Sequence, residues 1–212
     1  MRSLTTNDIN IPELCHDVLN ALLHGRSEIT PVVVLAGRTG GECKSVFLKP
    51  LHTIFQQYVF GITKECGNFP FLELLGAKVA FLDEYRFDPD LVSWASQCLW
   101  FDGSAVPVGR PQNVPGCTGN AMYKGTAPIF ITTKLSHLSS LQYSAEINPA
   151  TGQPWDTDAS MLLRRLKVYE FHTRVPKPAA IFPFCAACFV RLLQGQAAAW
   201  SAEAQGREAH ED

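Results

Sequence analysis

The sequence lacks an apolar run long enough to cross a membrane. Its longest apolar stretches are Val32 to Ala36 and the proline-broken segment Ala179 to Val190. Both fall well short of the roughly 18 residues that a spanning helix needs. Met1 to Asn10 also lacks the apolar centre of a secretory signal. We therefore expect an intracellular protein with no membrane partner.

The sequence also has little net charge and no cysteine framework. Its 18 basic and 20 acidic residues leave a formal charge of -2, so any contact with nucleic acid has to be local. Its seven cysteines are an odd number in a long chain, which favours reduced thiols over disulfides. With 46% hydrophobic residues in 212, the chain can bury a sizeable core, and this excludes disorder as its main class.

Apolar segments of strand and helix type alternate along the chain. Val32 to Ala36 has no polar alternation, as is typical of a strand buried on both faces of a parallel sheet. Similar strands are predicted at 78–82 and 128–133, with a short strand at 105–108 and a helix end or strand at 161–171. Helices are predicted at 11–23, 45–58, 91–100 and 190–206. The pattern predicts an α/β fold, a three-layer αβα sandwich around a mostly parallel sheet.

Three parts follow from this reading. Residues 1–26 form an N-terminal helix that leads into the core, and residues 27–178 form the core itself. Residues 179–212 form a C-terminal helical segment, whose acidic tail is expected to fray after Gly206.

A glycine-rich loop separates the first strand from the next helix, as in phosphate-binding loops. Its residues are Gly37, Arg38, Thr39, Gly40, Gly41, Glu42, Cys43, Lys44 and Ser45. Such a loop turns backbone amides toward phosphate oxygens. Lys44 would contact the β and γ phosphates of ATP, and Ser45 would bind Mg²⁺. The loop is one residue longer than the usual motif, and Cys43 replaces its second glycine, so a glycine-rich surface turn is the alternative.

Two adjacent acids end the second long strand. Asp83 and Glu84 follow Leu82 directly, which matches the second nucleotide motif. Asp83 would hold Mg²⁺, and Glu84 would activate the attacking water. The alternative is an ordinary strand-end aspartate that caps the next turn.

From about Ile11 to Pro176 the chain resembles the superfamily 3 helicase domain, the AAA+ P-loop ATPase of parvovirus and papillomavirus replication proteins. The segments that carry the resemblance are GGECKSVFLKPL, KVAFLDEYRF, VPVGR, APIFITTK and MLLRRLKVYEFHTRVP. The resemblance places Thr133 and Lys134 at the sensor, where the family usually has asparagine. It makes Arg165 the arginine finger, with Arg164 as the second choice, and a solvated face is the alternative for both. Arg110 and Lys124 are the basic candidates for DNA contact near a β-hairpin.

Cys185 and Cys188 have the spacing of half a zinc site. His172 is a lone further ligand candidate, and no second close pair of ligands lies nearby. Buried reduced thiols are therefore the preferred interpretation.

The resemblance implies an ATP-driven helicase that assembles as a homo-oligomer, a hexameric ring, and moves along single-stranded DNA. A degenerate nucleotide-binding or assembly module without turnover is the alternative, favoured by Cys43 and Lys134. A small-molecule kinase would explain neither the sensor strand nor the arginine pair. The family also implies a separate origin-binding or nicking domain, and a nuclear location if the protein serves viral-type or mobile-element replication.

Overall fold

A five-stranded parallel sheet forms the centre of the molecule, in the strand order β2-β3-β6-β1-β7. The strands are β1 (Val32–Gly37), β2 (Val59–Phe60), β3 (Val79–Leu82), β6 (Ile129–Lys134) and β7 (Leu166–Phe171). This computed structural model describes residues 2–55, 59–60, 72–90, 92–108, 121–176 and 185–211. Every residue of β1 is buried, as its unbroken apolar sequence requires.

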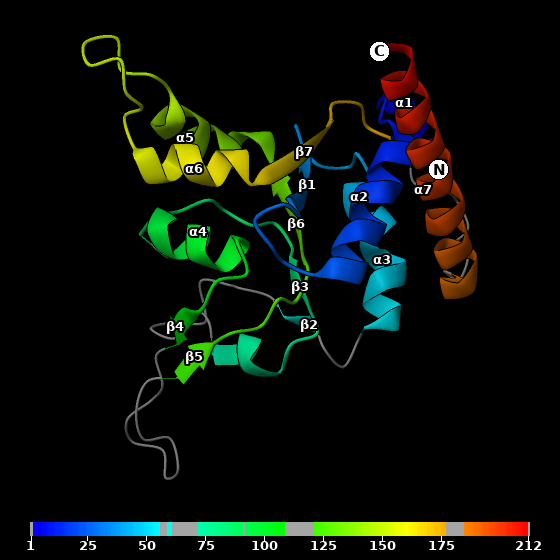
Figure 1. Ribbon diagram of the computed structural model, residues 1–212, viewed down its shortest axis with the longest axis horizontal. Helices are drawn as coiled ribbons and strands as arrows, with labels where there is room; N and C mark the ends of the chain where they lie inside the picture. Colours follow the sequence, from blue (N-terminus) through cyan, green and yellow to red (C-terminus); the bar gives the residue numbers. More distant parts are fainter. Residues whose placement is uncertain are drawn as a thin grey trace.

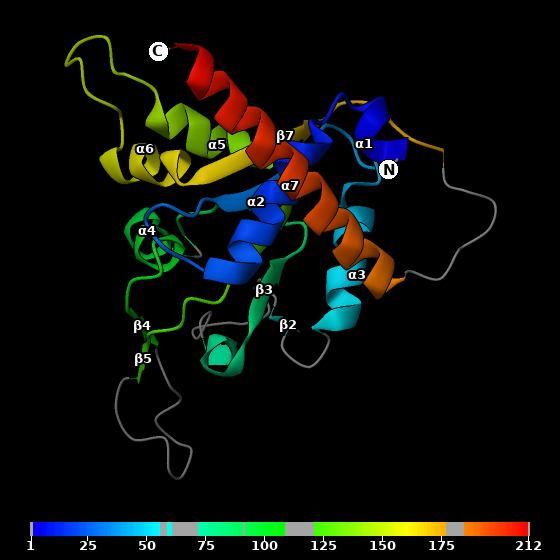
Figure 2. The ribbon, with the colours of Figure 1, turned by 45° about the vertical axis from the view of Figure 1, so that its right-hand side comes forward.

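Helices cover both faces of the sheet (Figures 1 and 2). Their bounds are α1 (Arg2–Thr6), α2 (Ile11–His24), α3 (Lys44–Ile54), α4 (Trp94–Phe101), α5 (Leu135–Ala145), α6 (Thr157–Arg164) and α7 (Ala186–Glu211). Val33 and Leu35 of β1 pack with α1, α2, α3 and α7, whereas Val32 and Val34 pack with α4, α5 and α6. Successive side chains of a strand point to opposite faces, so one apolar strand serves both cores. The predicted three-layer αβα fold is confirmed.

Side-chain caps fix where several helices begin. The amide of Glu13 donates to Asn10 Oδ1 (3.3 Å) at the start of α2, and Ala159 N donates to Asp156 Oδ1 (3.0 Å) at the start of α6. Such caps satisfy amides that have no partner within the helix. Gly25 ends α2 with φ of 66°, and a Cβ at this position would lie 2.2 Å from Thr126 O. Glycine is therefore required where the chain turns toward β1.

A short antiparallel pair extends from the layer that contains α4. It consists of β4 (Val106–Val108) and β5 (Ala121–Tyr123), with Val106 opposite Tyr123. The strand predicted at 105–108 is therefore present, and it belongs to a hairpin. The segment between the two strands, including Arg110, lies outside the described residues.

Two helices that the sequence did not predict, α1 and α5, complete the layers. The serine-rich α5 has only two buried residues, Leu138 and Leu141, so its apolar periodicity is weak. At the other end of the chain, α7 begins at Ala186 and continues to Glu211. The alanine-rich sequence of α7 favours helix, and the fraying expected after Gly206 stays a prediction.

Candidate functional site

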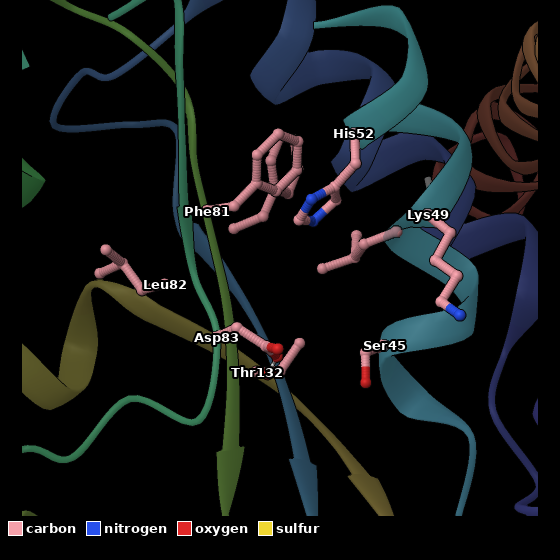
Figure 3. A pocket seen from close by; sticks show the side chains of 9 residues that line it. Ser45, Lys49, His52, Phe81, Leu82, Asp83 and Thr132 are labelled. Carbon is pink, nitrogen blue, oxygen red and sulfur yellow. Dashed lines mark hydrogen bonds between the residues drawn. The ribbon is translucent and has the colours of Figure 1, made fainter. Parts of the chain in front are cut away.

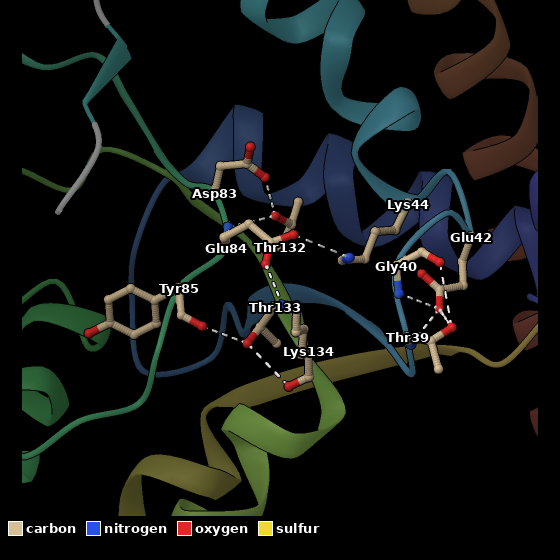
Figure 4. Close-up of polar contacts among 10 residues, drawn as sticks. All are labelled: Thr39, Gly40, Glu42, Lys44, Asp83, Glu84, Tyr85, Thr132, Thr133 and Lys134. Atoms are coloured by element: carbon tan, nitrogen blue, oxygen red, sulfur yellow. Dashed lines mark hydrogen bonds and ion pairs between the residues drawn. The ribbon is translucent and has the colours of Figure 1, made fainter. Parts of the chain in front are cut away.

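The predicted nucleotide-site residues meet at the carboxyl ends of three neighbouring strands. Gly37, the last residue of β1, is in register with Lys134 on β6, and Leu82 on β3 is in register with Ile131. The glycine-rich loop, the acid pair and the sensor residues therefore lie at the same edge of the sheet (Figure 4). Ligands of open parallel sheets bind outside this edge.

The loop after β1 contains three residues with left-handed backbone angles. Gly40 and Gly41 have φ values of 90° and 84°, and Cys43 has φ of 61°. Cys43 occupies the N-cap position of α3 and forms no side-chain cap there. An N-terminus of this kind favours an anion through its amides and dipole. The loop thus turns through left-handed backbone at two glycines and at Cys43 before α3 begins.

Glu84 lies between the two predicted lysines. Its Oε1 is 3.8 Å from Lys44 Nζ, and its Oε2 is 3.9 Å from Lys134 Nζ. The Lys44 side chain is 5% exposed, whereas that of Glu84 is 55% exposed. The pair with Lys134 joins two exposed side chains, and exposed pairs contribute little stability, so Glu84 can leave Lys134 at small cost.

Thr132 supports the acid pair, and the sequence analysis did not single it out. Its buried hydroxyl donates to Asp83 Oδ1 and accepts a hydrogen bond from Glu84 N (3.1 Å). Glu84 has φ of 51°, a strained conformation for a residue with a side chain. A hydroxyl that hydrogen-bonds to both acids at the end of a strand holds the two in place relative to each other. The sequence signal that could have pointed to Thr132 was its position directly before Thr133, which was predicted as a sensor.

Thr133 lies deeper in the fold than the sensor assignment implies. Its hydroxyl is fully buried and donates to Tyr85 O (2.6 Å). Lys134, the other residue predicted as a sensor, faces the acids through its ion pair with Glu84. The two residues predicted as sensors therefore differ in placement. Thr133 donates to the backbone of Tyr85, directly after the acid pair, and Lys134 places its positive charge beside Glu84.

Ser45 and Asp83 line one cavity of about 270 Å³ (Figure 3). A serine hydroxyl and one carboxylate are hard oxygen ligands, and Mg²⁺ commonly takes few protein oxygens while it keeps several waters. The donor set at this end of the cavity therefore fits Mg²⁺. No cluster of three or more His, Cys, Asp or Glu side chains suited to a metal occurs in the described part of the chain.

The other end of the cavity is aromatic. His52 on α3 stacks on Phe81 of β3, with ring centroids 4.0 Å apart and an angle of 27° between the rings. Burial lowers the pKa of His52, although the charge of Asp83 acts in the opposite direction. His52 is therefore an uncharged wall of the cavity at neutral pH.

Arg165 lies at the opposite edge of the sheet from the loop, directly before β7. Its guanidinium makes two hydrogen bonds to the Asp102 carboxylate, one of them from Nη2 to Oδ2 (2.6 Å), and Nη1 donates to Met161 O (2.6 Å). Arg164 is exposed and forms no hydrogen bond or ion pair within the described residues. The structure thus does not bring either arginine to the loop of its own chain.

Arg174 is a second residue that the sequence analysis missed. Its Nε donates to Thr39 Oγ1 (3.2 Å), and the next amide, Val175 N, donates to Gly41 O (3.2 Å). The segment after β7 therefore lies directly against the glycine-rich loop. Among the DNA candidates, Lys124 is exposed just after β5.

The expectation of buried thiols at Cys185 and Cys188 is wrong, because both are exposed. They lie at the N-terminus of α7, where Cys188 N donates to Cys185 Sγ (3.3 Å). That hydrogen bond and the Cys188 thiol lower the pKa of Cys185. His172 pairs with Glu170 at 3.2 Å, so the described residues give no complete zinc site.

The chain is similar in fold to solved structures of the C-terminal region of NrS-1. The apo structure of residues 305–718 matches with a TM-score of 0.53 at 14% identity, and an A-form apo structure matches with 0.50 at 13%. Each match covers 92% of this chain and 42% of the other, so the chain spans about two fifths of the neighbour's length. No family model and no curated protein matches. At this identity the likeness shows the fold.

None of the helices in the described ranges has the length and apolar character needed to cross a membrane.

Proposed function

We propose that this chain is the ATP-hydrolysing motor of a superfamily 3 type DNA helicase in DNA replication. The observation that carries the proposal is the meeting of Lys44, Asp83 and Glu84 at one sheet edge, beside a loop with left-handed backbone at Gly40 and Gly41. Phosphate-binding loops and metal-binding acids have this relation in nucleotide hydrolases. The similarity of fold to the NrS-1 C-terminal region is compatible with the proposal.

Each residue has a role that its position permits. The buried Lys44 ammonium would neutralise charge on the β and γ phosphates, and Ser45 and Asp83 would hold Mg²⁺. Bound Mg²⁺ supplies charge neutralisation of the phosphate oxygens. Glu84 is exposed and held only by loose ion pairs, so its carboxylate can accept a proton from the attacking water. Lys134, next to Glu84, would add positive charge near the γ phosphate.

The position of the arginines supports the proposal of a ring. A finger has to reach the transferring phosphoryl group, and Arg164 and Arg165 lie at the other edge of the sheet from their own loop. In a head-to-tail ring, that edge of one subunit would face the loop of the next. The exposed Arg164 is better placed to donate than Arg165, whose guanidinium is already bound to Asp102. Hydrolysis should therefore need an oligomer, for which the family resemblance suggests a hexamer.

Single-stranded DNA is the proposed track. The hairpin of β4 and β5 extends from the core (Figure 1), and Lys124 follows it at the surface. A lysine there can contact the phosphate backbone without reading sequence.

A nucleotide-binding assembly module without turnover is the second candidate. Lys44 and Lys134 both pair with Glu84, so each of its two carboxylate oxygens already faces an ammonium group. If these pairs persist with nucleotide bound, the chain would bind ATP without cleaving it. Hydrolysis measurements separate the two candidates.

The test is ATP hydrolysis with and without single-stranded DNA, for wild type, Lys44→Ala and Glu84→Gln. Lys78→Ala is the control, because Lys78 is exposed at the start of β3, away from the loop. We expect DNA-stimulated hydrolysis in wild type and control, no ATP binding in Lys44→Ala, and binding without hydrolysis in Glu84→Gln. Binding without hydrolysis in wild type would favour the assembly module. Absence of Mg-ATP binding to wild type would refute both candidates.

A further inference from the structure

The Glu42 side chain folds back into the phosphate-binding loop that contains it. Its Oε1 accepts hydrogen bonds from Thr39 N (2.6 Å) and Gly40 N (2.8 Å), and from Thr39 Oγ1 (3.1 Å) (Figure 4). Glu42 is fully buried although it belongs to a surface loop. The carboxylate therefore engages two backbone amides of the loop.

The rest of the loop closes around this carboxylate. A Cβ at Gly37 would lie 2.9 Å from Glu42 Oε2 and 3.2 Å from Lys44 Cδ, so the acid and the lysine stem share one confined space. Glu42 Oε2 is buried without a hydrogen-bond partner in the described residues. Burial alone would raise the pKa of Glu42, but the amides and the Thr39 hydroxyl lower it below its ordinary value. The acid is thus ionised at neutral pH, with one oxygen satisfied and the other not.

These amides belong to the type of donor that such a loop offers to phosphate. Successive N–H groups turned inward form an anion site, and a carboxylate resembles a phosphate in charge and in its acceptor oxygens. Two anions at the same donors would repel each other strongly in a confined space. We propose that Glu42 is an internal competitor for the nucleotide phosphates, which holds the empty loop closed and has to leave before a triphosphate binds. This inference rests on the proposed nucleotide site.

Two features bear on that exchange. Ser3 Oγ on α1 donates to Glu42 O (2.6 Å), so the backbone of Glu42 is anchored by a contact that does not involve its carboxylate. On the solvent side, a Cβ at Gly40 would meet nothing within 4 Å. Only molecules with an open loop bind nucleotide. The apparent affinity is therefore the intrinsic affinity multiplied by the fraction of molecules whose loop is open.

The test compares binding of Mg-ATP by calorimetry to wild type, Glu42→Gln and Glu42→Asp. Glutamine keeps the shape but removes the charge, whereas aspartate keeps the charge but shortens the reach to the amides. Glu146→Gln is the control, since Glu146 is exposed beyond α5. Thermal melting without nucleotide confirms that each variant is folded.

We expect both Glu42 variants to bind Mg-ATP about tenfold more tightly than wild type. A closed state that occupies about nine tenths of the molecules lowers the apparent affinity about tenfold, and the variants should remove that state. The control should match wild type. Equal or weaker binding by folded Glu42 variants would overturn the competitor role and leave the nucleotide site intact. No binding by wild type or any variant would instead refute the proposed function, and the competitor role with it.

Discussion

Replacement of Thr132 by valine should loosen both acids of the pair Asp83 and Glu84 at once. Thr132 is 3% exposed, and its hydroxyl joins Asp83 to the backbone of Glu84. Valine has nearly the same shape, so the substitution removes the hydroxyl without opening a cavity. The bond to the Asp83 carboxylate is of the charged kind, worth about 1.5 to 3 kcal/mol. The bond from Glu84 N adds about 0.5 to 1.5 kcal/mol, since water can reach that strand end.

Together these losses predict that Thr132→Val lowers the free energy of unfolding by about 2 to 4.5 kcal/mol. For a chain of this size each kcal/mol lowers the melting temperature by roughly 2 to 4 °C, so a drop near 10 °C is expected. The variant should also lose ATP hydrolysis by at least about tenfold, because Glu84 no longer has a fixed backbone. Thr132→Ser is the matched control, because it keeps the hydroxyl. If the valine and serine variants melt and hydrolyse ATP alike, the bridging role of Thr132 is wrong.

Three further predictions follow from single features. Cys43 has φ of 61°, a left-handed conformation that costs a residue with a side chain about 1 to 2 kcal/mol, so Cys43→Gly should raise the melting temperature by roughly 2 to 4 °C for each kcal/mol of strain removed. A thermal melt no higher than that of wild type would show that this backbone is not strained. Arg165→Ala should lower the free energy of unfolding by about 3 kcal/mol, because it leaves Asp102 unpaired. Arg164→Ala should leave the melting temperature unchanged and abolish oligomer-dependent hydrolysis. The reverse pattern would restore the finger role to Arg165. Burial lowers the pKa of His52 below its ordinary value of 6.5, so the unfolded chain takes up this proton first, and the free energy of unfolding should decline as pH falls below about 6.5. In His52→Leu, the free energy of unfolding measured with urea should depend less on pH between about pH 7 and 5. An unchanged pH dependence would assign the effect to another group.

The strands and the acid pair could be predicted from the sequence because their signals are local. Val32 to Gly37 and Val79 to Leu82 are apolar along their whole length, and a parallel sheet brings their following loops to one edge. The roles of Lys44 and Glu84 as nucleotide residues remain predictions, although the structure places the two side chains next to each other.

What the sequence could not predict depends on contacts between distant residues or on one rotamer. The pairing of Arg165 with Asp102 joins positions 63 residues apart, and no local pattern marks it. Glu42 looks like a solvated loop residue until its side chain is seen to accept hydrogen bonds from Thr39 and Gly40. Cys185 and Cys188 lie in an apolar stretch, but they begin a helix and remain exposed there.

The placement of β6 between β1 and β3 affects how the protein is made. The loop and the acid pair are both synthesised in the first half of the chain, yet their strands do not touch, because Val33 pairs with Phe130 and Phe81 pairs with the same Phe130. A nascent chain that ends before Ile129 therefore has no strand to join them, and local pairing alone cannot align Lys44 with Glu84. Contacts between distant segments form late in folding. The predicted nucleotide site would thus be assembled only after the central strand has left the ribosome, so an unfinished chain would lack the arrangement proposed to bind ATP.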